Sequence, residues 1–339
     1  MGEPDPIERA AGGESIYEVT DWEPRSVLDR FAVQVYAGLV TGSKWLVVLL
    51  ALAITVAIVG LSGLDLVLEP TVSALVGMSV LPALALFVYL HYADVTSGEP
   101  FGLLAITFLL ATITAGFAAV INSVALSALG GVANLFGQTV AIGVFFYIVV
   151  GPVEETVKLL AVRLYAYPDE RFDAVIDGAV YGAVAGLGFA TIENAIYITD
   201  LIQSEGGLAA STSGQLGGIT ASRAIAGPGH VLYSGIAGYY LGLAKFNRDR
   251  VGPIVAKGLI VAALFHATYN FTVGAGANVL ATTLPVSNFV AVVAYVLAFQ
   301  SVVGYYLYRK IDRYRKAYDE YGADRIETDH SPERTEFDP

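Results

Sequence analysis

The sequence predicts an all-α fold, a polytopic transmembrane helical bundle of about eight spans with both termini cytoplasmic. Of its 339 residues, 55% are hydrophobic and only 15% are charged, and the mean hydropathy is +0.62. Soluble globular domains carry about 25% charged residues, so this is the composition of a membrane protein. The chain has no cysteine, which excludes disulfides, a thiolate nucleophile and a thiolate metal site.

Eight apolar stretches are long enough to cross the hydrocarbon core of a bilayer, which takes about 20 residues. They are residues 45–64, 72–92, 102–121, 138–163, 177–198, 227–245, 253–273 and 288–308. They divide the chain into five parts: an acidic cytoplasmic N-terminal tail (1–44), three transmembrane helices (45–135), a four-helix core (136–275), an eighth helix (276–310) and an acidic cytoplasmic C-terminal tail (311–339).

Orientation follows from the basic residues. Lysine and arginine cluster before the first span, between the fourth and fifth, between the sixth and seventh, and after the eighth. The connections after spans one, three and seven contain none. Because cytoplasmic loops carry the excess of positive charge, we expect a multi-pass protein of the cell membrane. The net charge of −12 is concentrated in the tails, and an acidic protein is a poor partner for nucleic acid.

Small residues at four-residue spacing predict close helix packing. Gly178, Gly182 and Gly186 recur along the fifth span, and Gly238 and Gly242 recur along the sixth. This spacing lets two helix backbones approach closely in lipid. We therefore expect spans four to seven to form a tight bundle.

The fourth span carries the densest charge within an apolar segment. Its sequence GPVEETVKLLAVR holds the adjacent carboxylates Glu154 and Glu155, and Lys158 follows one helical turn after Glu154. Ionisable groups at membrane depth are costly and usually functional. Glu154 and Lys158 share a helix face, while Glu155 projects toward another neighbour. The pattern favours one glutamate that activates water and one that is structural, and the spacing does not decide which is which.

Three further spans bring polar groups to a similar depth, as judged from the rise of 1.5 Å per helical residue. Glu193 lies roughly 24 Å from the cytoplasmic end of its span, His266 roughly 20 Å and His230 roughly 22 Å, while Glu154 and Glu155 lie at about 18 to 20 Å. The supporting residues Phe189, Asn194 and Asn270 lie within one turn of these groups. We expect all of them to meet in one intramembrane site.

This set of residues favours hydrolysis of a peptide bond in or near the outer half of the bilayer. A glutamate is expected to act as general base on water, with histidine and Asn270 stabilising the oxyanion. No metal or other cofactor is expected, because the HExxH spacing typical of zinc peptidases is absent. If a metal is present, Glu155, His230 and His266 are the expected ligands.

Four motifs in order carry a resemblance to a known family. EETVK (Glu154, Glu155, Lys158), GFATIEN (Phe189, Glu193, Asn194), GPGHVLYSGIAGYYLG (His230) and HATYN (His266, Asn270) resemble those of PrsW-type intramembrane proteases, relatives of the CAAX prenyl protease and bacteriocin-processing superfamily. The resemblance covers roughly residues 140–275. It implies a metal-independent glutamate protease in which Glu154, Glu155 and His266 are catalytic and Glu193, His230 and Asn270 support them. Bacterial members cleave membrane-anchored anti-sigma factors, which implies a membrane-anchored protein substrate.

Three other functions use the same residues. The first is a zinc-dependent intramembrane peptidase. The second is a non-enzymatic membrane scaffold, in which the buried charges only order the bundle. The third is a proton-coupled transporter, because intramembrane glutamate and histidine also form proton relays; the chain, however, lacks the internal repeat common in transporters. Partners other than the substrate and the lipid bilayer, and the oligomeric state, do not follow from the sequence.

Overall fold

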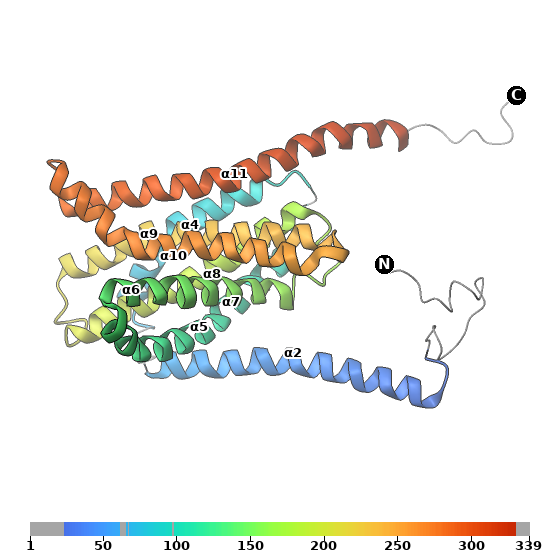
Figure 1. The fold of residues 1–339 in the computed structure, drawn as a ribbon, viewed down its shortest axis with the longest axis horizontal. Helices are drawn as coiled ribbons and strands as arrows, with labels where there is room; N and C mark the ends of the chain where they lie inside the picture. The colour runs from blue at the N-terminus through green and yellow to red at the C-terminus, as the bar shows by residue number, and fades with distance from the viewer. Residues whose placement is uncertain (1–23, 62–65, 67, 97, 330–339) are drawn as a thin grey trace, which may run out of the picture. The chain divides into compact units, whose positions relative to one another are not determined.

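The structure, a computed structural model, describes residues 24–61, 66, 68–96 and 98–329, and this part of the chain contains helices and no strands (Figure 1). The principal helices are α2 (Val27–Leu61), α4 (Pro70–Tyr92), α5 (Phe101–Phe136), α6 (Gln138–Val144), α7 (Gly151–Leu164), α8 (Val175–Ser204), α9 (Ser213–Lys245), α10 (Val251–Thr283) and α11 (Asn288–Asp329). The chain forms two compact units, Met1–Leu50 and Ala51–Pro339. The second contains every predicted site residue.

The all-helical membrane fold predicted from the sequence is confirmed. Among the described residues, seven segments are long and apolar enough to cross a membrane. They are Val27–Gly60, Pro70–Tyr92, Phe101–Phe136, Gln138–Leu164, Val175–Ser204, Arg248–Thr283 and Asn288–Glu320. The predicted sixth span, 227–245, lies in the 33-residue helix α9, whose glycines and polar side chains lower its hydropathy. Seven apolar segments and α9 agree with a count of about eight.

Two helices begin earlier than the apolar stretches within them. The helix α2 begins at Val27 rather than at residue 45. The helix α9 begins at Ser213 rather than at residue 227, and it starts with a capping box. There the Thr212 hydroxyl accepts from the backbone N–H of Gln215, whose side chain accepts from the backbone N–H of Thr212. Capping residues fix where a helix starts, whereas hydropathy marks only the part suited to lipid.

The pair of α8 and α9 forms the centre of the second unit. Of the seven apolar segments, α8 is buried the most completely. A Cβ added at Gly178, Gly182 or Gly186 would collide with the backbone of α9. At Gly186 the colliding group is the carbonyl of His230. The predicted close packing of the glycine faces is confirmed, and it sets the position of His230 relative to α8.

The backbone is irregular just before the paired glutamates. A π-helical segment, Phe145–Val150, joins α6 to α7, and Pro152 lies in the first turn of α7. Proline lacks an N–H to donate, and π segments inside helices are frequent at functional sites. The backbone of α7 also approaches α10 closely, because a Cβ on Gly151 would lie 2.7 Å from the carbonyl oxygen of Ala263. This contact brings Glu154 and Glu155 next to His266 of α10.

Candidate active site

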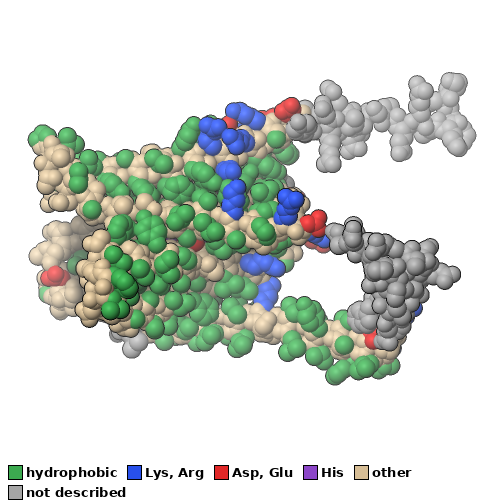
Figure 2. Space-filling model, in the orientation of Figure 1, with side chains coloured by type: hydrophobic (Ala, Val, Ile, Leu, Met, Phe, Trp, Pro, Cys, Tyr) green, Lys and Arg blue, Asp and Glu red, His purple; other side chains and the backbone are tan. Residues whose placement is uncertain are grey.

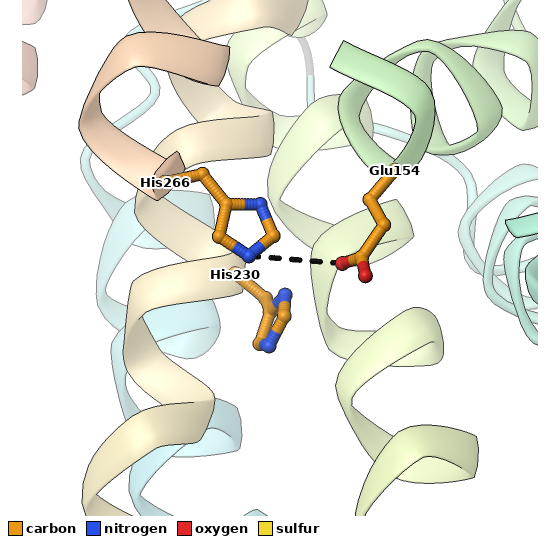
Figure 3. A group of neighbouring side chains, drawn as sticks. All are labelled: Glu154, His230 and His266. Carbon is orange, nitrogen blue, oxygen red and sulfur yellow. Dashed lines mark ion pairs between the residues drawn. The ribbon is translucent and has the colours of Figure 1, made fainter. Parts of the chain in front are cut away.

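A cavity of about 500 Å³ lies among α5, α7, α8, α9 and α10. Its lining includes five of the predicted residues, which come from four different helices: Glu154, Glu193, His230, His266 and Asn270. Figure 3 shows Glu154 of α7 and the imidazoles of His230 and His266 converging on one space. The structure thus brings these side chains together, and their joint role as a site stays a prediction.

Both carboxylate oxygens of Glu155 have polar partners. Its side chain is completely buried. The Oε1 atom accepts from Lys158 Nζ at 2.7 Å and lies 2.8 Å from His266 Nδ1. The Oε2 atom accepts from the Ser234 hydroxyl at 3.2 Å. Because both oxygens are engaged and Glu155 does not line the cavity, this carboxylate is placed to orient His266 rather than to contact a substrate.

Glu154 faces the cavity with one free oxygen. Its Oε1 atom accepts from the Asn122 amide at 3.0 Å, whereas Oε2 is buried and makes no hydrogen bond. The nearest cationic or basic atoms to Oε2 are His266 Nε2 at 3.7 Å and Lys158 Nζ at 3.9 Å. A buried carboxylate oxygen without a donor is a strong acceptor for a proton, a water or a cation.

Lys158 fixes the tautomer of His230. The ammonium group of Lys158 lies 3.0 Å from His230 Nδ1, and because an ammonium has only protons to offer, Nδ1 must accept. His230 Nε2 then carries the proton and donates to Glu193 Oε2 at 2.9 Å. Phe189 packs against this pair: its ring centroid lies 5.5 Å from that of His230 and 4.3 Å from Lys158 Nζ.

Glu193 is also paired with Arg223 of α9, which lies at the wall of the cavity. The guanidinium of Arg223 donates to Asn194 Oδ1 at 2.8 Å and lies 4.3 Å above the ring of Tyr197. The amide nitrogen of Asn194 donates to Ser79 Oγ at 3.0 Å, so that this side chain links α8 to α4. Asn194 thus holds Arg223 in place and does not line the cavity, whereas the predicted Asn270 does.

Several residues of the site are absent from the sequence prediction, among them Asn122, Arg223 and Tyr233. Asn122 lies on α5 beyond the predicted end of the third span. Arg223 precedes the predicted start of the sixth span and therefore falls in a predicted loop. Tyr233 follows His230 by three residues, and its ring stacks on His266 with centroids 5.1 Å apart. Its hydroxyl is buried without a hydrogen-bond partner. A charged residue just outside an apolar run, as at Arg223, is a signal that could have been used.

The charges of the site leave an excess of one negative charge. Glu154, Glu155 and Glu193 contribute −3, and Lys158 and Arg223 contribute +2, so the sum is −1 with both histidines neutral. Glu155 and Glu193 have close cationic partners, whereas the cation nearest to Glu154 is Lys158, with Nζ 3.9 Å from Oε2. The excess therefore resides on Glu154.

The donor set is also one that zinc accepts. One potential ligand atom each from Glu154, His230 and His266 lies within 4.8 Å of the other two, and catalytic zinc is commonly held by two histidines and a glutamate. Glu155 on Nδ1 of His266 matches the second shell that orients zinc-bound histidines. His230 is the least available of the three ligands, because both of its ring nitrogens are already hydrogen-bonded. The group contains Glu154 where the sequence analysis placed Glu155.

Comparisons with known proteins found similar sequences. The profile of a family described as "PrsW family intramembrane metalloprotease" matches residues 99–302, which include every predicted site residue. The chain is 28% identical over 215 residues to Protease PrsW of Bacillus subtilis (strain 168), covering 62% of this chain and 88% of that protein. It is 29% identical over 213 residues to Protease PrsW of Shouchella clausii (strain KSM-K16), covering 62% and 89%. No solved structure matches the chain.

Proposed function

Since this chain belongs to the PrsW family of intramembrane proteases, we propose that it hydrolyses peptide bonds of membrane-anchored proteins in the cavity between α7, α9 and α10. The observation that carries this assignment is the free, buried Oε2 of Glu154, which faces His266 Nε2 across 3.7 Å. A water that bridges these two atoms from the cavity could donate one hydrogen to each, because Nδ1–H of His266 donates to Glu155 and leaves Nε2 as an acceptor. That is the arrangement required of a general base and its partner.

Each residue then has a distinct task. Glu154 takes the proton from the attacking water and returns it to the leaving amine as the C–N bond breaks, while His266 Nε2 accepts the second hydrogen of the water and holds it in place. Glu155 is a positioning residue, because its contact with Nδ1 of His266 presents Nε2 to the cavity. Lys158 balances the charge of the buried carboxylates.

Tyr233 and Asn270 are the proposed donors to the oxyanion. Both line the cavity, and the Tyr233 hydroxyl has no partner among the described residues. A donor held in place before the substrate arrives stabilises developing negative charge without reorganisation. His230 is less available for this task, since its Nε2 proton is committed to Glu193.

Zinc dependence is the second candidate, and two observations favour it: the family description names metalloproteases, and Glu154, His230 and His266 form a three-donor set. These three residues would hold the ion. Bound zinc supplies Lewis-acid polarisation of a carbonyl oxygen. The absence of a cofactor, expected from the sequence, stays a prediction.

Orientation in the membrane is part of the proposal. Figure 2 shows one face of the second unit. Most of the lysine and arginine side chains visible there lie toward one end of the helices. By the excess of positive charge on cytoplasmic loops, that end of the second unit faces the cytoplasm. The cytoplasmic location of both termini, expected from the sequence, stays a prediction. The cavity then opens in the outer half of the bilayer, where the scissile bond of a single-span substrate would lie.

The decisive experiment is cleavage of single-span substrates by the full-length protein reconstituted in liposomes. Wild type, Glu154→Gln and the matched control Glu205→Gln, an exposed acidic residue after α8, are each assayed with and without a strong zinc chelator. Loss of cleavage only in Glu154→Gln supports the metal-free mechanism. Loss in Glu154→Gln and in chelated wild type, with recovery on adding zinc, supports the zinc enzyme. Full cleavage by Glu154→Gln contradicts both.

A further inference from the structure

A second group of buried carboxylates lies far from the active-site cavity. Asp94 and Glu99 lie in the connection between α4 and α5, and Asp177 lies in the first turn of α8. Asp177 precedes Glu193 on the same helix by sixteen residues, which corresponds to roughly 24 Å. No task in the proposed hydrolysis falls to this group.

The three carboxylates face one another. One oxygen from each lies within 4.8 Å of the other two. The Thr96 hydroxyl bridges two of them, at 2.7 Å from Asp94 Oδ1 and 3.3 Å from Asp177 Oδ1. Glu99 and Asp177 are 6% and 1% exposed, respectively. Burial this deep removes most of the water that would otherwise solvate the charges.

Several oxygen atoms of the group lack a donor. Asp94 Oδ2 and Glu99 Oε1 are buried and make no hydrogen bond, and the same is true of the Tyr181 hydroxyl. Tyr181 is completely buried and lies one turn after Asp177 on α8. Helical side chains lean toward the N-terminus of their helix, so its hydroxyl is directed back at the group. The negative charges that act most strongly on this hydroxyl are those of Glu99 and Asp177.

The described part of the chain brings no lysine or arginine into direct contact with the group, although the charges of Asp177 and Lys245 act on each other at longer range. Among the described residues, no lysine or arginine forms an ion pair with Asp94, Glu99 or Asp177, and the one basic side chain hydrogen-bonded to the group is His91, at 3.0 Å from Glu99 Oε2. Three carboxylates this close together repel one another, and a bound cation would offset that repulsion.

We propose that Asp94, Glu99 and Asp177 form a binding site for a divalent hard cation, with Ca²⁺ as the preferred ion. Carboxylate and hydroxyl oxygens are the ligands of such ions. Ca²⁺ accepts irregular arrangements of such oxygens, whereas Mg²⁺ demands near-ideal octahedral geometry. Carboxylates that come from a connection and from the start of a helix suit the ion with the more flexible geometry. The free oxygens and the Tyr181 hydroxyl supply the ligand atoms.

The ion would tie the α4–α5 connection to the start of α8. Asp177 already accepts hydrogen bonds from the backbone N–H groups of Asp173 and Ala174, at 2.8 and 2.9 Å, through Oδ2. Its Oδ1 accepts from the Thr96 hydroxyl at 3.3 Å and keeps a second lone pair for a cation. A cation there would stabilise the folded protein, because it binds the native arrangement and not the unfolded chain.

The test uses the purified full-length protein in detergent, stripped with EDTA and then freed of it. Ca²⁺ binding is measured by equilibrium dialysis with ⁴⁵Ca, and thermal unfolding is measured with and without CaCl₂. The variant is Asp94→Asn with Glu99→Gln, which keeps side-chain size and removes like charges. Asp177 is left intact because it caps α8. Glu170→Gln, an exposed acidic residue in the α7–α8 connection, is the matched control.

We expect one Ca²⁺ per chain in wild type and in Glu170→Gln, and a rise in unfolding temperature on adding CaCl₂. Affinity for Ca²⁺ should fall by at least about tenfold in the double variant, as ligand charge is lost, and Mg²⁺ should bind more weakly than Ca²⁺ to the wild type. Because the double variant retains the whole active-site set, the loss reports on this group alone. Wild type that binds no Ca²⁺, or a double variant that binds and is stabilised equally, overturns the proposal.

Discussion

The Nδ1 atom of His266 lies 2.8 Å from Oε1 of Glu155, with both side chains almost completely buried. This contact directs Nε2 of the same ring toward Glu154. Two glutamates that are adjacent in sequence thus reach the same imidazole from opposite sides. One faces the cavity and one does not, so substitutions at the two positions should differ in their effects.

Substituting Glu154 by glutamine should abolish cleavage and leave the fold intact. Glutamine keeps the size of the side chain and an oxygen for the Asn122 amide, but it cannot accept the proton of water. General-base catalysis contributes about 10²- to 10⁴-fold, so kcat should fall within or beyond that range. Thermal unfolding in detergent should change little, since Glu154 Oε2 makes no hydrogen bond. Normal turnover would remove Glu154 from the mechanism.

Glu155 and Lys158 should be coupled in stability. Lys158→Met leaves Glu155 as a buried carboxylate without its cation, and breaking a buried ion pair destabilises by about 3–5 kcal/mol. Adding Glu155→Gln to Lys158→Met removes the stranded charge and should restore much of the unfolding temperature. Activity should not return, because His266 loses its charged partner. Strictly additive effects of the two substitutions on stability would argue against a coupled pair.

Tyr233→Phe should lower kcat without loss of stability. The substitution keeps the ring that stacks on His266 and removes only a hydroxyl that has no partner. Removal of one oxyanion donor typically lowers kcat by about 10²- to 10³-fold. The measurement is a comparison of kcat and KM with wild type in the reconstituted assay. An unchanged kcat would leave Asn270 as the remaining proposed donor.

Hydropathy and small-residue spacing sufficed to predict the membrane fold and the packing of α8 on α9. They failed at helix ends, because capping residues such as Thr212 determine where a helix begins. They also failed at Arg223, which extends the candidate site beyond the apolar part of α9. The similar depth of Glu154, Glu193, His230 and His266 in the membrane could be predicted, because the regular rise of a helix converts the number of residues from its end into a distance. The division of labour between Glu154 and Glu155 could not, since it depends on which partner reaches each oxygen.

Gly182→Ala should destabilise the protein, although alanine is the better helix former. A Cβ at this position collides with the backbone carbonyl of Ser234 on α9, and overpacking of this kind costs about 1–3 kcal/mol. Gly217→Ala is the matched control, because its Cβ meets no atom within 4 Å on an exposed face of α9. Thermal unfolding in detergent should separate the two variants; equal unfolding temperatures would contradict the close approach of α8 and α9.

Arg223 should prove essential for the arrangement of Glu193 although no reaction step is assigned to it. Its guanidinium pairs with Glu193, donates to Asn194 and covers Tyr197, three contacts that a lysine ammonium cannot reproduce together. Arg223→Lys and Arg223→Gln should therefore both lower activity. Arg223→Gln should also lower the unfolding temperature, because it leaves Glu193 with His230 as its one hydrogen-bonded partner among the described residues.

The double variant Arg223→Gln with Glu193→Gln is the control. It removes the unpaired carboxylate, so the unfolding temperature should recover. If Arg223 only stabilises the helices, activity should recover with it. If Arg223 positions Glu193 and, through it, His230, activity should stay low.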